Sequence, residues 1–170
     1  NLNKYLEYIS LVLKHINRHE FSLIIPLDDK GQIWVENICY SDSIENINFL
    51  TNFNEFLYNS NLLKNFKIKN INFVEDYFIK ECTSYKYNCY KIISRSKCRG
   101  FIYIFNYKED YKKTFSSDDN INFFLNMLAV GIENYVLLNI NKKHENTERE
   151  IASGAEIQSR LLPDFCPKIF

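Results

Sequence analysis

The chain has 170 residues, of which 46% are apolar and 25% charged, values that fit one globular domain with an appendage and exclude wholesale disorder. Lysine and arginine together number 21, as do aspartate and glutamate, so the net charge gives no electrostatic reason to expect DNA, RNA or an anionic membrane as the main partner. The sequence has no uninterrupted apolar run of about 18 residues and no signal-peptide pattern, which predicts a cytoplasmic chain without a transmembrane helix. Five cysteines without CxxC spacing favour reduced thiols over a disulfide scaffold.

The N-terminal part predicts a helix, then a β-hairpin, then more helix. Residues 1–19 form the first helix, because apolar residues recur at steps of three and four. Phe21–Leu27 and Gln32–Tyr40 are runs of strand-forming residues joined by an Asp/Gly turn, which is typical of a hairpin. Helical spacing returns over 47–57, and Asn70–Val74 is a further predicted strand.

The C-terminal part predicts a second hairpin and a long helix. Tyr85–Ser94 and Arg99–Tyr107 are strands joined by a polar turn, and the helix begins near residue 118. Residues 141–150 contain no apolar side chain. The apolar pattern then resumes in a different phase until Pro163 ends the helix.

This order of elements indicates an α+β domain with an antiparallel sheet. The N- and C-terminal helices both carry narrow apolar seams, so we expect them to pack together on one face of the sheet. The same seams are the predicted surface of a homodimer. The residues assigned to it are Leu6, Leu13, Ile121, Leu125, Leu128, Ile132 and Tyr135.

Residues 1–140 resemble a GAF domain, the small-molecule sensor module of bacterial signalling proteins. The resemblance is carried by a last strand that begins at Gly100, then by Phe115-Ser116-Ser117-Asp118-Asp119, then by the helix from Ile121 onward. It implies a central antiparallel sheet of about five to six strands and a ligand pocket, with the ligand unknown. Aromatic residues on its walls would suit a small apolar ligand, although they fit a packed core equally well. The pocket candidates are Trp34, Phe73, Tyr77, Tyr87 and Tyr103.

A second resemblance lies at the C-terminus, where residues 154–163 look like the entry helix of SpoIIE/RsbU-type serine phosphatases. These enzymes belong to the PPM class and require manganese or magnesium. The resemblance implies a GAF-like sensor over 1–140, a helical linker over 141–163 and the start of a phosphatase domain over 164–170. Because the family's Gly-Gly-Asp metal-binding segments are not found here, this chain is expected to be regulatory, without catalytic activity and without a cofactor of its own. The assigned linker residues are Gly154, Ile157, Gln158, Leu161, Leu162 and Pro163, and Pro167 follows.

Gly154 is unfavourable inside a helix, by about 1 kcal/mol relative to alanine. The close approach of a partner helix would compensate for that cost. A hinge at this point could transmit the state of the sensor to a downstream domain.

Two alternative functions remain open. The first is a ligand-binding GAF sensor attached to another output, such as a histidine kinase. The second is an enzyme of GAF-like fold, such as a methionine sulfoxide reductase, which the scattered cysteines disfavour.

Several sharper site hypotheses are also disfavoured. His15 and His19 have zinc-compatible spacing but no evident third ligand, and Cys82 and Cys89 match no bilin-attachment motif. Phe73-Val74-Glu75-Asp76 lacks the Asn-Lys half of the cyclic-nucleotide signature of GAF domains. A basic group around the second hairpin could bind a nucleotide phosphate, although a solvated turn explains it more simply. That group is Lys91, Arg95, Lys97 and Arg99.

Overall fold

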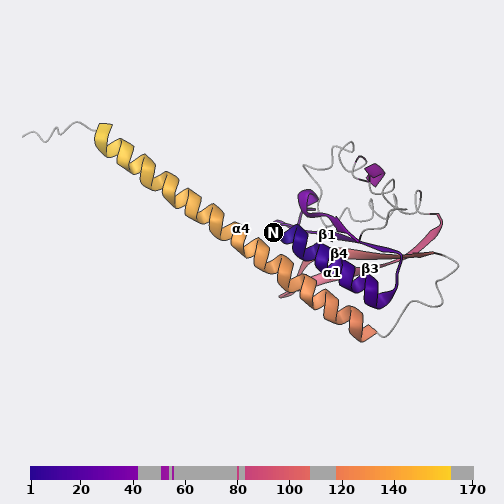
Figure 1. Ribbon diagram of the computed structural model, residues 1–170. Helices are drawn as coiled ribbons and strands as arrows, with labels where there is room; N and C mark the ends of the chain where they lie inside the picture. Colours follow the sequence, from indigo (N-terminus) through magenta and orange to yellow (C-terminus); the bar gives the residue numbers. More distant parts are fainter. Residues whose placement is uncertain (42–50, 54, 56–79, 81–82, 108–117, 162–170) are drawn as a thin grey trace, which may run out of the picture. The chain divides into compact units, whose positions relative to one another are not determined.

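The computed structural model describes residues 1–41, 51–53, 55, 80, 83–107 and 118–161 (Figure 1). The chain divides into two compact units, Asn1–Tyr135 and Val136–Phe170, and the boundary lies inside one long helix. The first unit contains all the described strands, which form one antiparallel sheet, and helices that cover it. The predicted α+β class is therefore confirmed.

The sheet has the strand order β2-β1-β4-β3 among the described residues. The central strands are β1 (Phe21–Pro26) and β4 (Lys97–Tyr107), and the edges are β2 (Cys39–Tyr40) and β3 (Tyr85–Ser94). All neighbours are antiparallel, and β3 and β4 form the predicted second hairpin. Four strands are described, compared with the five to six expected, and the predicted strand at 70–74 lies outside the described residues.

The first helix, α1 (Leu2–Asn17), forms where the sequence predicts it. Asn1 caps it by accepting a hydrogen bond from the backbone N–H of Asn3, which satisfies one of the free donors of the first turn. Leu2, Leu6, Ile9 and Leu13 of its apolar seam are buried, whereas Ile16 at the end of the seam is exposed. A buried serine cluster also connects this helix to the sheet: Ser10 Oγ lies 2.9 Å from Ser22 Oγ, and Ser41 Oγ accepts from the backbone N–H of Ser22 at 2.7 Å.

The predicted strand over 32–40 is wrong in its extent. A turn held by the Asp28 carboxylate, which accepts from the backbone N–H groups of Lys30 and Gln32, leads into a single β-bridge between Leu27 and Ile33. A short 3-10 helix, η1 (Val35–Asn37), follows before β2. The strand-forming residues here pack against the core from irregular backbone, so their tertiary contacts outweigh their local propensity.

An aromatic core cluster fills one face of the sheet. Phe21 and Phe105 stack with ring centroids 4.3 Å apart, and Tyr85 meets Phe21 edge-on. The alternate residues of the same strands, such as Ser22, point toward the helices. The buried members of the cluster are Phe21, Leu23, Ile25, Leu27, Ile33, Phe53, Phe101, Tyr103 and Phe105.

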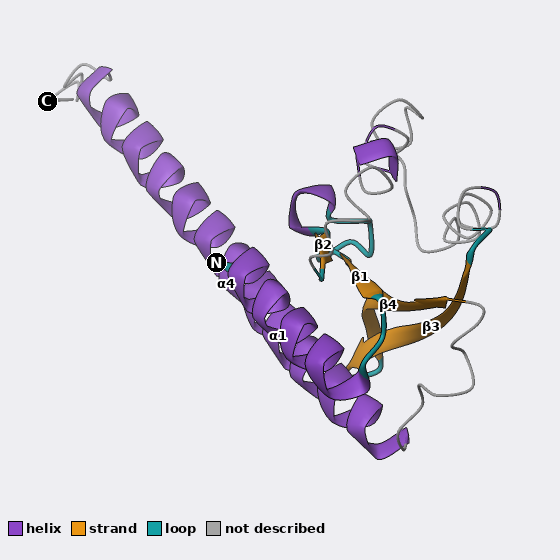
Figure 2. Ribbon diagram, turned by 45° about the vertical axis from the view of Figure 1, so that its right-hand side comes forward, coloured by secondary structure: helices purple, strands orange, loops and turns teal. Residues whose placement is uncertain are grey.

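The last helix, α4 (Asp118–Leu161), runs without a break through the polar stretch 141–150. Within the first unit it lies beside α1 (Figure 2). The Tyr5 hydroxyl donates to the backbone carbonyl of Met127 at 2.8 Å, and burial raises the pKa of this phenol. The Tyr5 ring lies so close to Gly131 that a Cβ atom there would be 2.1 Å from it. A glycine on α4 therefore permits this helix contact.

A register shift on β4 places an arginine between the sheet and α4. Ile92 is opposite Gly100 and Ile93 is opposite Cys98, so Arg99 has no partner on β3. Such a bulge redirects a side chain, and the Arg99 guanidinium forms an ion pair with the carboxylate of Glu133 on α4. Both side chains are buried.

One helix, α4, has the length and, within residues 120–160, the composition of a membrane span, with a mean hydropathy of 1.5 over its most apolar window. The sequence predicted no transmembrane helix because no run of about 18 residues is apolar throughout. The mean hydropathy of a window is a less strict criterion, because a window can contain polar residues and still reach a high mean. The core helix of a globular domain can have the same length and composition as a membrane span. The burial of Ile121, Leu128 and Ile132 is what such a core helix shows.

Candidate functional site

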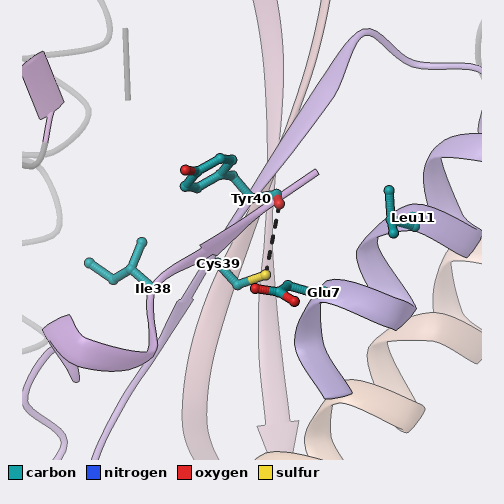
Figure 3. A pocket seen from close by; sticks show the side chains of 5 residues that line it. All are labelled: Glu7, Leu11, Ile38, Cys39 and Tyr40. Carbon is teal, nitrogen blue, oxygen red and sulfur yellow. Dashed lines mark hydrogen bonds between the residues drawn. The ribbon is translucent and has the colours of Figure 1, made fainter. Parts of the chain in front are cut away.

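Two hollows border the exposed side of α1. The first has a volume of about 370 Å³ and lies between α1 and β2 (Figure 3). Glu7 and Leu11 contribute one wall from the helix, and Ile38, Cys39 and Tyr40 contribute the other.

The thiol of the first hollow is not a nucleophile. Burial, and to a lesser degree the nearby Glu7 carboxylate, raise the pKa of Cys39 to about 12. The thiol donates weakly to the Tyr40 carbonyl at 3.9 Å, as the dashed line in Figure 3 shows. Because reactive cysteines need an accessible thiolate, this hollow offers a binding surface with one carboxylate and no catalytic thiol.

The second hollow has a volume of about 520 Å³ and lies at the C-terminal end of α1. We call it the basic cleft, and it is lined by Leu11, Lys14, His15, Arg18 and His19. Burial, followed by the positive charge of Lys14, lowers the pKa of His19 to about 4. His19 is therefore neutral at physiological pH, and Leu11 connects the basic cleft with the first hollow.

The three predicted pocket residues that the structure describes, Trp34, Tyr87 and Tyr103, are not among the described residues that line either hollow. Tyr103 is fully buried in the core cluster and Tyr87 packs against it, so these two form part of the hydrophobic core. Trp34 lies elsewhere, with its ring against Tyr135 and its indole N–H donated to the Glu36 carboxylate at 3.0 Å. Phe73 and Tyr77 lie outside the described residues.

The predicted dimer seam needs correction. Five of its seven residues are buried within one chain, so they are not available to a second copy. Leu125 and Tyr135 are half-buried. The fully buried set is Leu6, Leu13, Ile121, Leu128 and Ile132.

The described linker residues of α4 are exposed. Gly154, Ile157 and Gln158 belong to the run 141–160, in which every residue is exposed, and nothing lies within 4 Å of a Cβ placed on Gly154. No described residue of the chain contacts Gly154, and the contact with a partner helix stays a prediction. The side chain of Leu161, together with Leu162 and Pro163, lies outside them.

The four basic residues at the second hairpin differ in their exposure to solvent. Lys91, Arg95 and Lys97 are exposed as expected of a solvated turn, whereas Arg99 is buried against Glu133. Within the described residues, no group of three or more His, Cys, Asp or Glu side chains could hold a metal ion. His15 and His19 both line the basic cleft, although α1 ends at Asn17 and they do not share one helical face.

Two features of the site were not anticipated from the sequence. Leu11 lies off the apolar seam, and nothing in the pattern marks it as the residue shared by both hollows. Arg18 follows the end of α1 and adopts a left-handed backbone, φ 52°. Helices often end at a left-handed residue, which is usually glycine, and here that residue is an arginine. This unusual residue type is the one signal that could have identified the C-terminal end of α1 as part of a site.

Neither a family model nor a curated protein matches this sequence. Among solved structures, the chain is similar to the GAF domain/HD domain protein from Geobacter sulfurreducens. The match has a TM-score of 0.52 and 11% sequence identity, and it covers 81% of this chain and 95% of the other. This similarity shows the fold, which is GAF-like.

Proposed function

We propose that this chain is the regulatory, signal-transducing domain of a larger bacterial signalling protein. The GAF-like fold supports a sensory role for the first unit. The observation that carries the proposal is the continuity of α4, which supplies core residues such as Leu128 and extends without interruption to Leu161. Every residue over 141–160 is exposed, so this stretch of helix has no packing partner among the described residues, and its extension fits a connection to another domain.

The proposed output is a serine phosphatase of the PPM class. The support is the resemblance of residues 154–163 to the entry helix of SpoIIE/RsbU-type enzymes. In this proposal the manganese or magnesium ions belong to the catalytic domain, and residues 1–170 have no hydrolytic activity. The alternative is a histidine kinase output that uses the same sensor.

The output can be tested with the natural gene product extended beyond Phe170. We expect Gly-Gly-Asp segments in the extension and manganese-dependent release of phosphate from a phosphoserine peptide, with none released by residues 1–170 alone. Autophosphorylation on histidine would support the kinase alternative and contradict the phosphatase. Substitution of the aspartates in those segments is the control for a contaminating phosphatase.

The proposal includes a homodimer formed through a surface different from the predicted seam. Phe123 and Val130 are exposed and lie seven residues apart on α4, whereas five of the seven predicted residues are buried. Apolar residues at such spacing form the contact line between paired helices. We propose a cytoplasmic location. Because the charges of the chain balance, we propose neither nucleic acid nor a membrane as its main partner.

A further inference from the structure

The basic cleft concentrates nitrogen-bearing side chains in one place. Four of its five described lining residues are lysine, arginine or histidine, the fifth is Leu11, and none of the five is acidic. Three of the four, Lys14, His15 and Arg18, are at the surface or only partly buried, so their side-chain nitrogens can reach a ligand in the hollow. The cleft therefore presents positive charge beside one apolar side chain.

His19 is a buried polar side chain in the wall of this positively charged cleft. It is 3% exposed, and neither of its ring nitrogens has a hydrogen-bond partner in the described part of the chain. Lys14 further disfavours a proton on the ring. The amide of the neighbouring Asn17 also has no partner among the described residues. Buried polar groups nearly always have hydrogen-bond partners, so these unpaired groups indicate that the wall of the cleft lacks an interaction partner within the described residues.

Arg18 keeps a charged side chain where the backbone favours glycine. Its φ of 52° belongs to the left-handed region, which strains residues that have a Cβ atom. Its N–H donates to the Lys14 carbonyl at 2.8 Å, which partly neutralises the negative end of the helix dipole beside the cleft. The guanidinium is not needed for this cap, because glycine would provide the same N–H.

We propose that the basic cleft binds a phosphate-class oxyanion, with Arg18 and His15 as its direct ligands and Leu11 as an apolar contact for a group attached to the anion. A tetrahedral oxyanion can accept from several donors at once, and the guanidinium fork fits two of its oxygens. The anion would act on His19 through charge across the wall of the cleft. This site is independent of the proposed phosphatase output and of the dimer.

The test is a phosphate titration of residues 1–170, followed by NMR of the His19 ring protons at constant ionic strength. Inorganic phosphate is the probe, with sodium chloride and sodium acetate as parallel titrants. We expect phosphate to bind and to raise the pKa of His19 from about 4, because a nearby anion favours the protonated ring. Acetate should bind at least several-fold more weakly, because it offers two oxygens.

Arg18→Gly separates ligand binding from folding. It should raise the thermal midpoint by relieving the left-handed strain, and it should weaken phosphate binding about tenfold or more through loss of a charge-assisted contact. The matched control is Arg95→Gly. Arg95 is also an exposed arginine with a left-handed backbone, φ 48°, but it lies in the β3–β4 turn. This control should be stabilised in the same way and bind phosphate within about twofold of the original chain.

Three results would overturn the proposal. The first is a phosphate response no larger than that of chloride, which would mean that water alone satisfies the cleft. The second is equal weakening by Arg18→Gly and Arg95→Gly, which would indicate general charge screening. The third is acetate binding as tight as phosphate, which would exclude the assigned ligand class. None of these results depends on the activity of a downstream domain.

Discussion

Arg99 and Glu133 form a buried ion pair that joins β4 to α4. Removing one partner of such a pair leaves an uncompensated charge in a poorly solvated site. Glu133→Gln should therefore lower the free energy of unfolding by about 3–5 kcal/mol. Urea denaturation followed by circular dichroism would measure this change.

The control replaces both partners, as Arg99→Met with Glu133→Leu. Apolar residues of similar volume often substitute for a buried pair at little cost, so the double variant should unfold within about 1–2 kcal/mol of the original chain. If Glu133→Gln costs less than about 1 kcal/mol, the pair is solvated and the described burial does not hold in solution.

The burial of Arg99 could not be predicted from the sequence, for a specific physical reason. It stands among the exposed Lys91, Arg95 and Lys97, and strand alternation is the only pattern that could have distinguished it. The bulge inserts one unpaired residue at Arg99 and thereby breaks that alternation. Its partner, Glu133, comes from an element 34 residues away, which no local pattern reveals.

At the scale of elements, the contact between α1 and α4 depends on a glycine. Gly131→Ala should force the Tyr5 ring away, because a Cβ would lie 2.1 Å from Tyr5 Cε1, and the hydrogen bond to the Met127 carbonyl would be lost. Overpacking of this kind costs about 1–3 kcal/mol, which outweighs the gain of about 1 kcal/mol in helix propensity. Thermal unfolding should show a lower midpoint.

The same substitution elsewhere on α4 provides the control. Gly154 has nothing within 4 Å of a Cβ position, so Gly154→Ala should leave the unfolding midpoint of the first unit unchanged and strengthen local helix. A midpoint for Gly131→Ala equal to that of Gly154→Ala would mean that the Tyr5 ring adjusts without cost. In that case the close contact would not organise the two helices.

Elements with strong local signals were predicted well. The α1 helix, the β3–β4 hairpin and the long C-terminal helix all follow from apolar periodicity and turn residues. The segment 32–40 was predicted less well. Val35 lies in the 3-10 helix η1 and Ile38 directly follows it, and both side chains pack against the core without forming a strand. Propensity alone cannot distinguish such packing from a strand.

For the whole molecule, periodicity identified the right helices but could not show that most residues of their seams are buried within one chain. An apolar seam reports burial but does not say whether the covering surface belongs to the same chain or to another. Leu6 and Ile132 are covered within the first unit. The exposed residues Phe123 and Val130 lie on the same helix, outside the predicted seam, and only the three-dimensional arrangement distinguishes the two sets.

The proposed homodimer predicts a specific response to charge on α4. Native mass spectrometry of the purified chain should show twice the chain mass, and Phe123→Asp combined with Val130→Asp should yield monomers, because two aspartates per chain would face each other across an apolar contact. Asn122→Asp adds one such charge at an exposed polar position of α4 and should leave the dimer intact.

Both variants should keep the circular dichroism of the original chain, because the substituted residues are exposed and the buried seam is untouched. This distinguishes them from Ile132→Asp, which would place a charge at a fully buried position and unfold the domain. A double variant that remains dimeric would remove this face of α4 from the interface. In that case, the signal that we propose to pass along α4 would not depend on contacts between Phe123 and Val130 of two copies of the helix.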